Sequence, residues 1–169
     1  ADLGDKSAIA AAVGGIKPEI RLCEGVQHVY LNGEDVSAQI RLPEVSMAAS
    51  AVSSVPEVRA ALLEMQRDIA RKNSVIMDGR DIGTVVLPNA KVKIFLTAAP
   101  EIRARRRFDE LCAKGSAVTF EEVLRDLNER DYNDSHRAAA PLKQAEDAVL
   151  ADTSGLDFEQ SVELVCGII

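Results

Sequence analysis

The sequence predicts an α/β fold with a parallel sheet, and three observations support this class. An apolar run at 74–77 leads directly into the Asp-Gly-Arg sequence at 78–80. A buried parallel strand delivers charged residues to the carboxyl edge of a sheet in this way, and ligands of such sheets bind at that edge. Two further apolar runs, 92–96 and 148–151, are each followed by a predicted helix. Strands that alternate with helices are typical of parallel sheets.

The N-terminal part of the chain is predicted to contain a β-hairpin. Two alternating segments, 26–31 and 34–36, are separated by Asn32-Gly33. Asn-Gly between alternating residues is a strong signal for a two-residue hairpin turn. Residues 20–23 are predicted to add a third strand.

Two helices are predicted after the hairpin. Pro43 and Pro56 each occupy a favourable first helical position. From Pro56 onwards, apolar residues recur at spacings of three and four, which predicts one buried stripe. The residues of this stripe are Val58, Leu62, Met65 and Ile69.

The helices of the C-terminal part also have clear start signals. One begins after Pro100, and Thr119 with Glu122 has the spacing of a capping box that opens the next. That second helix ends in a dense polar segment, 129–137. The last helix is expected from about Asp157. Its inward residues are predicted to be Phe158, Val162 and Val165.

Composition excludes several classes of protein. The 169 residues predict one domain with small inserted lobes, and the net charge of -7 argues against general nucleic-acid binding. No apolar run is long enough to span a membrane, and no secretory signal opens the chain. Three widely spaced cysteines, Cys23, Cys112 and Cys166, fit neither a disulfide framework nor a metal site. We therefore expect a cytoplasmic protein, acting as a monomer on small molecules.

Arginines are concentrated at 103–107. Arg103, Arg106 and Arg107 stand at i, i+3 and i+4, so they share one helical face. One interpretation is a solvated face whose arginines pair with Glu101 and Glu110. The other is a clamp on a polyphosphate, because phosphoryl transfer depends on positioning and charge neutralisation.

A second group of charged residues supports the phosphate interpretation. Arg130 and Arg137 add cations from a separate segment, which suggests a helical lid at about 103–137 that closes over phosphates. Asp78 lies where nucleoside-triphosphate enzymes place the acid that organises Mg²⁺, and Arg80 is positioned to meet an anion. The alternative for 78–80 is a polar turn after a strand.

Several blocks of sequence, taken together and in order, resemble bacterial cytidylate kinases. The similarity covers essentially all 169 residues. The blocks are 31–36, 40–41 with 43–45, 48–50, 78–86 with Pro88, 93–98, 129–131 with Asp134, and 137–138 with 140–142. Each block alone is unspecific, but the combination is highly specific.

The resemblance implies a P-loop nucleoside monophosphate kinase-like fold. Residues 1–72 would form a small α+β monophosphate-binding lobe with its lead-in. Residues 73–169 would form the core strands and helices, including the lid. The implied reaction moves the γ-phosphoryl group of ATP to CMP or dCMP, with Mg²⁺, to give CDP or dCDP.

The resemblance also implies which residues hold the acceptor nucleotide. The matching positions are Ser50, Arg59, Arg80, Asp81, Asp134 and Arg137. Ser50 and Asp81 correspond to residues that read the cytosine. Arg59 and Arg80 are placed for base or phosphate contacts, and Asp134 matches a carboxylate that binds the ribose.

Other matched positions concern the phosphoryl group that is transferred. Arg130 and Arg137 resemble the cations that contact it, and Asp78 completes the implied catalytic set. Arg103 and Arg107 match lid arginines near the phosphates of ATP. No residue is assigned as a direct metal ligand.

One feature of the family is absent from the sequence. Cytidylate kinases open with a strand and a G-x-x-x-x-G-K-[ST] loop, whereas Gly14-Gly15 is followed by Ile-Lys-Pro, with neither the spacing nor the helix start. We therefore expect part of a longer kinase, without its N-terminal core strands. Its remaining parallel strands should end near Asp78, Ala98 and Asp152, and ATP turnover should be low. The alternatives are a non-catalytic nucleotide-binding fragment that has lost the ATP site and another small-molecule kinase of the same architecture.

Overall fold

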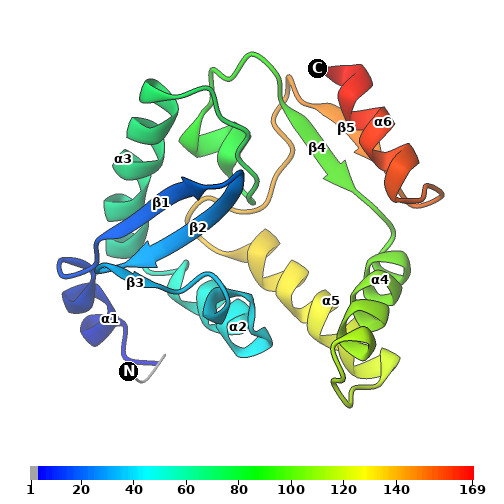
Figure 1. Ribbon diagram of the computed structural model, residues 1–169, viewed down its shortest axis with the longest axis horizontal. Helices are drawn as coiled ribbons and strands as arrows, with labels where there is room; N and C mark the ends of the chain where they lie inside the picture. Colours follow the sequence, from blue (N-terminus) through cyan, green and yellow to red (C-terminus); the bar gives the residue numbers. More distant parts are fainter. Residues whose placement is uncertain (1–3) are drawn as a thin grey trace. The chain divides into compact units, whose positions relative to one another are not determined.

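The computed structural model describes residues 4–169, except for the side chains of Pro43, Ser46, Met47 and Ser50. The chain forms two compact units, Ala1–Val75 and Ile76–Ile169 (Figure 1). The described elements of the first unit are α1 (Lys6–Val13), β1 (Pro18–Cys23), β2 (Val26–Leu31), β3 (Glu34–Asp35), a 3-10 turn (Gln39–Arg41), α2 (Pro43–Val52) and α3 (Pro56–Lys72). Those of the second are a π-helical turn (Ile82–Val86), β4 (Ile94–Thr97), α4 (Pro100–Ala113), α5 (Phe120–His136), β5 (Val149–Asp152) and α6 (Phe158–Ile168).

The predicted hairpin and its third strand are confirmed. Strands β2 and β3 pair antiparallel with Leu31 opposite Glu34, so Asn32 and Gly33 form a two-residue turn. Their φ values of 51° and 89° are both left-handed, as this turn requires. Strand β1 pairs along its whole length with β2.

The two proline-initiated helices α2 and α3 are also confirmed. The apolar stripe of α3 is confirmed in part, because Val58 packs with Ile9 of α1 and Val55 in a buried cluster. Leu62 is exposed, which contradicts the predicted stripe. Helix α1 has two turns and packs at the first part of α3, so it does not cover the position of Leu62.

The second unit contains a parallel pair of strands. Residues 94–97 of β4 pair in register with residues 149–152 of β5, so both strands end at the same edge. Ala98 and Thr153, the residues that follow, are buried. These two strands and their common edge are confirmed.

The predicted strand at 74–77 is wrong. Among the described residues, no segment pairs with 74–78, and Ile76 is 95% exposed. A strand requires hydrogen bonds to a neighbour, and an apolar run without one gains nothing from its β-branched residues. The described part of the chain thus contributes two of the three expected parallel strands.

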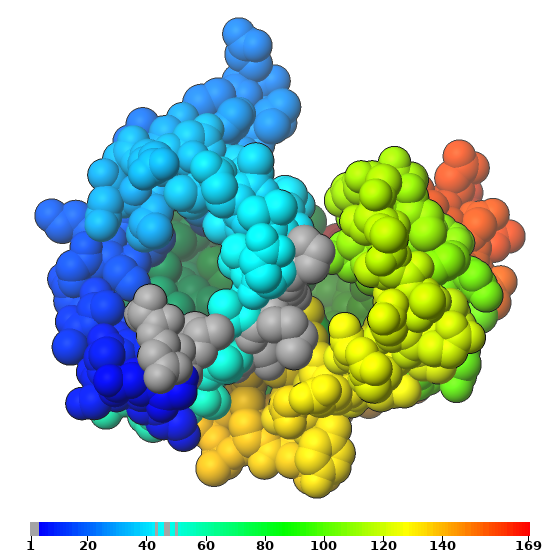
Figure 2. Space-filling model, turned by 90° about the horizontal axis from the view of Figure 1, so that it is seen from below, coloured from blue at the N-terminus to red at the C-terminus, as the bar shows by residue number. Residues whose placement is uncertain are grey.

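Helices α4 and α5 pack side by side, as Figures 1 and 2 show. Their buried centre consists of Ala104, Leu111 and Val123. The capping box that opens α5 is confirmed, because Thr119 Oγ1 accepts from the Glu122 amide at 3.2 Å and Glu122 Oε2 accepts from the Thr119 amide at 2.8 Å. This pair of helices carries most of the candidate site.

The last helix, α6, begins where the sequence predicted but does not bury the predicted residues. Phe158 is 83% exposed and Val162 is also exposed, while Val165 is half-buried. Helix α6 packs against β5, and this strand of four residues is too short to cover the whole face of the helix.

Two further sequence predictions concern the surface of the protein. The three cysteines are exposed and free. Within the part of the chain that the structure describes, no helix has both the length and the apolar character needed to cross a bilayer.

Candidate functional site

A rigid turn fixes the position of Arg80 and Asp81. The π-helical turn that follows them is unusual, and such turns occur often at functional sites. The Asp81 carbonyl oxygen accepts hydrogen bonds from the amides of Thr84 (3.3 Å), Val85 (2.8 Å) and Val86 (3.2 Å). Val86 is buried, so the turn is anchored both by hydrogen bonds and by packing.

The second part of the site comes from the end of α5. Arg130, Asp134 and Arg137 are spaced by four and three residues, which places them on the same side of the helix. The loop beyond α5 folds back onto this end. The Leu142 amide donates to the Asp134 carbonyl at 2.8 Å, and Arg137 Nε donates to the Ala140 carbonyl at 2.8 Å.

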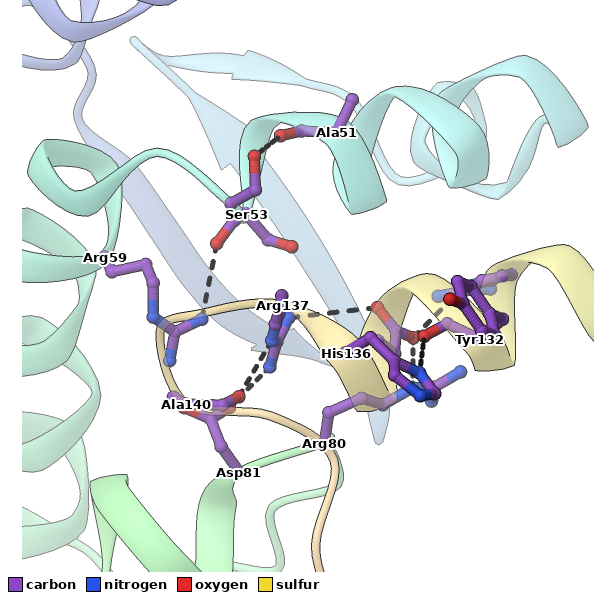
Figure 3. Close-up of polar contacts among 12 residues, drawn as sticks. Ala51, Ser53, Arg59, Arg80, Asp81, Tyr132, His136, Arg137 and Ala140 are labelled. Atoms are coloured by element: carbon purple, nitrogen blue, oxygen red, sulfur yellow. Dashed lines mark hydrogen bonds and ion pairs between the residues drawn. The ribbon is translucent and has the colours of Figure 1, made fainter.

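These two segments meet around a buried carboxylate (Figure 3). The Asp134 side chain is 5% exposed, and its Oδ2 accepts from Arg80 Nε at 3.0 Å. Arg130 Nε lies 3.8 Å from the same oxygen, and Arg137 Nη1 lies 3.8 Å from Oδ1. Arg137 Nη2 is also 3.8 Å from Asp81 Oδ1. We call these five residues the Asp134 cluster.

The Asp134 cluster has an excess of positive charge. Three guanidinium groups face two carboxylates, which leaves one positive charge over. The pKa of Arg130 is lowered, first by burial and then by the positive charge of Arg80, against the opposing effect of Asp134. A buried cation that is crowded by other cations is stabilised by an incoming anion. The cluster is therefore suited to hold a phosphate group.

The cluster also contains hydrogen-bond acceptors of fixed position. Asp81 and Asp134 have side chains that are 12% and 5% exposed. A buried carboxylate accepts hydrogen bonds from amino groups and hydroxyls and rejects other acceptors. Arginines and carboxylates in one cluster can thus bind a phosphate and select the polar groups attached to it.

The three arginines on one face of α4 have different partners. Arg103 Nε donates to the Ala98 carbonyl at 2.8 Å, and its Nη1 lies 2.7 Å from Asp131 Oδ2. Arg107 pairs with the half-exposed Glu110 at 2.7 Å. Exposed pairs of this kind are weak, so Arg107 can exchange Glu110 for another anion at little cost.

Arg106 does not belong to a phosphate clamp. Its Nη2 donates to the carbonyls of Thr153 (2.6 Å) and Leu156 (2.9 Å), and its Nη1 donates to Thr153 Oγ1 at 3.1 Å. These bonds tie α4 to the turn after β5, which makes Arg106 structural. The interpretation of Arg103, Arg106 and Arg107 as one uniform clamp is wrong for this residue.

We expect Arg106→Leu to lower the free energy of unfolding by about 1–2 kcal/mol, because hydrogen bonds from a charged donor are lost at a partly exposed site. Arg107→Leu, one position further on, is the matched control and should change stability by less than about 0.5 kcal/mol. Urea unfolding followed by circular dichroism measures both values. Equal stability of the two variants would contradict the structural role of Arg106.

Three predicted site residues remain, namely Arg59, Ser50 and Asp78. Arg59 is in α3 of the first unit, where its Nη1 donates to the Ser53 carbonyl at 3.4 Å (Figure 3). The side chain of Ser50 lies outside the described residues. Asp78 is in the second unit and is exposed. The roles of all three stay predictions.

The sequence analysis assigned no role to Asp131. Its carboxylate holds Arg103 and so links α5 to α4. Asp131 stands three residues before Asp134 on the same helix, and this spacing could have predicted that both lie on the same side of α5.

The structure also bears on metal binding. Among the described residues, no group of three or more His, Cys, Asp or Glu side chains is arranged to hold a metal ion.

Comparison with known proteins gives a consistent result. Residues 2–169 match the family model described as cytidylate kinase. A cytidylate kinase of Caldicellulosiruptor bescii is 49% identical over 161 residues, which cover 95% of this chain and 71% of that protein. The cytidylate kinase of Pasteurella multocida is 46% identical with the same coverage. That of Flavobacterium johnsoniae is 46% identical, over 100% of this chain and 74% of its own length.

Proposed function

The chain belongs to the cytidylate kinase family, and from this premise we propose that it is an ATP-dependent kinase that phosphorylates CMP and dCMP. The observation that carries the proposal is the Asp134 cluster, which combines an excess positive charge with the buried carboxylate of Asp134 and the partly buried carboxylate of Asp81. A nucleoside monophosphate offers the complementary groups, because it has one phosphate, ribose hydroxyls and a base edge.

We assign the acceptor nucleotide to five of the residues that the resemblance to cytidylate kinases names. Asp81 accepts from the exocyclic amino group of cytosine, together with Ser50, and Asp134 accepts from the ribose hydroxyls. Arg80 and Arg59 contact the phosphate or the base. The short distance between Arg80 Nε and Asp134 Oδ2, 3.0 Å, supports these roles. It holds Arg80, which donates hydrogen bonds to the phosphate, beside Asp134, which accepts them from the ribose hydroxyls.

ATP supplies the γ-phosphoryl group for the reaction. Arg130 and Arg137 contact this group during transfer and neutralise the charge that it carries, and Asp78 completes the catalytic set. Arg103 and Arg107 hold the phosphates of the donor. Mg²⁺ is expected to accompany ATP in this family, but no residue of this chain is assigned to it.

The finer architecture is part of the same proposal. The family implies the P-loop nucleoside monophosphate kinase fold, and the structure has a parallel sheet with helices. We infer that residues 1–72 bind the monophosphate and that α4 and α5 form the lid. The monomeric state of the protein and its location in the cytoplasm stay predictions. The shared description of the relatives as cytidylate kinases favours a kinase over a non-catalytic nucleotide-binding module.

We expect CMP and dCMP to be phosphorylated in preference to AMP and GMP, since a site that hydrogen-bonds one base edge leaves buried groups unpaired with another. The sequence contains no G-x-x-x-x-G-K-[ST] loop. Activity is therefore measured in a chimaera that joins an N-terminal segment bearing this loop to the chain. The loss of ATP, followed by chromatography with one acceptor nucleotide at a time, should be at least tenfold faster with CMP or dCMP than with AMP or GMP, a ratio that corresponds to roughly one missing hydrogen bond. Equal rates for CMP and AMP would refute the assigned specificity.

A further inference from the structure

Gly79 lies one residue before the Asp134 cluster begins, and although it is exposed, the Ile82 side chain occupies the space that a Cβ on it would need. A Cβ atom on Gly79 would lie 2.9 Å from Ile82 Cγ1 and 3.2 Å from Ile82 Cδ1. Contacts under 3.0 Å are essentially absent from proteins, so any larger residue would displace Ile82 or the backbone of residue 79. The φ of Gly79 is not in the left-handed region, so Ile82 is the obstacle to a side chain rather than the backbone itself.

The backbone of Ile82 is held in place by the turn. Ile82 is the first residue of the π-helical turn, and its carbonyl accepts from the Leu87 amide at 2.7 Å. Its β-branched side chain also has restricted rotamers. One residue further on, a Cβ on Gly83 would lie 3.4 Å from Lys93 Cδ, so the turn packs closely against Lys93.

Arg80 and Asp81 lie between Gly79 and Ile82 in the sequence. Arg80 must reach Asp134 at 3.0 Å, and Asp81 must lie 3.8 Å from Arg137. A shift of either end of the segment would change both distances, because just two residues separate Gly79 from Ile82.

We propose that Gly79 and Ile82 are positioning residues for the acceptor nucleotide: the Ile82 side chain fits where a Cβ at position 79 would be, and this fit sets the turn that directs Arg80 towards phosphate and Asp81 towards the base. The proposal rests on the proposed function, because it assumes that the Asp134 cluster binds CMP. It goes further in naming this fit, between two residues to which no nucleotide contact is assigned, as a determinant of affinity and of base selectivity.

The test is calorimetric titration of CMP and AMP into four forms of the chain, namely wild type, Gly79→Ala, Ile82→Ala and the double variant. Gly79→Ala should weaken CMP binding by about tenfold or more, the scale of an overpacked contact. It should also reduce the ratio of CMP affinity to AMP affinity, because it displaces Asp81, which contacts the base. The double variant should bind CMP within about threefold of Ile82→Ala, a small difference on the affinity scale, because the alanine Cβ then has space.

Gly155→Ala is the matched control, since a Cβ there meets nothing within 4 Å. Its CMP affinity should equal that of the wild type. Wild-type affinity and selectivity in Gly79→Ala would overturn the proposal. So would a double variant that binds far more weakly than Ile82→Ala.

Two other outcomes have distinct meanings. A Gly79→Ala chain that is unfolded by circular dichroism, beside a folded double variant with normal CMP binding, would overturn the positioning role and assign the contact to folding. Failure of the wild-type chain to bind CMP would overturn the proposed function itself, and this proposal with it.

Discussion

Replacing Arg137 with methionine is expected to lower kcat for CMP phosphorylation by about a hundredfold or more, the scale for loss of one contact to transition-state charge. Methionine has a similar length but donates no hydrogen bonds. The Arg137 side chain is 10% exposed and lies 3.8 Å from both Asp81 and Asp134. The measurement is the initial rate of CDP formation by the chimaera at saturating CMP and ATP.

Arg125→Met is the matched control for Arg137→Met. Arg125 is on the same helix, is 70% exposed and pairs with its neighbour Asp126. Its loss should leave kcat unchanged. A kcat for Arg137→Met within about threefold of wild type, a small change on the transition-state scale, would contradict the assigned role.

Replacing Asp134 with asparagine is expected to have two opposite effects on stability and to weaken CMP binding. In buffer without phosphate, the free energy of unfolding should fall by about 2–3 kcal/mol, because three arginines lose the carboxylate that they share. Added inorganic phosphate should then stabilise the variant more than it stabilises the wild type, since the site has gained positive charge. CMP affinity should nevertheless fall, because the ribose hydroxyls lose a charged acceptor.

Thermal unfolding at increasing phosphate concentration measures the two effects on stability. Asp126→Asn, an exposed position on the same helix, provides the control and should show the wild-type phosphate dependence. If the stability of Asp134→Asn depends on phosphate concentration as that of the wild type does, the cluster is not an anion site.

The parts of the fold that were predicted correctly depend on short-range signals. The Asn32-Gly33 turn needs two left-handed residues, and the Thr119–Glu122 capping box closes within one helical turn. The strand at 74–77 and the buried face of α6 depend instead on which segments lie beside them. Local sequence does not contain that information. The strand at 74–77 has no pairing partner among the described residues, and β5, against which α6 packs, is too short to cover the helix.

The same distinction applies to the candidate site. Helical spacing correctly placed Arg103, Arg106 and Arg107 on one face of α4. It could not show that Arg103 meets Asp131, 28 residues away, or that Arg106 meets Thr153, 47 residues away. The resemblance to cytidylate kinases named the members of the Asp134 cluster, but the excess positive charge became visible from the distances.

Calorimetric titration of CMP into the 169-residue chain tests the central claim most directly, because it needs no phosphoryl transfer. We predict binding at one site, with an affinity for CMP at least tenfold above that for AMP, which corresponds to about 1.4 kcal/mol. We also predict that Arg137→Met removes most of this binding while Arg125→Met leaves it intact. Equal affinities for CMP and AMP, or CMP binding that is indifferent to Arg137, would contradict the account.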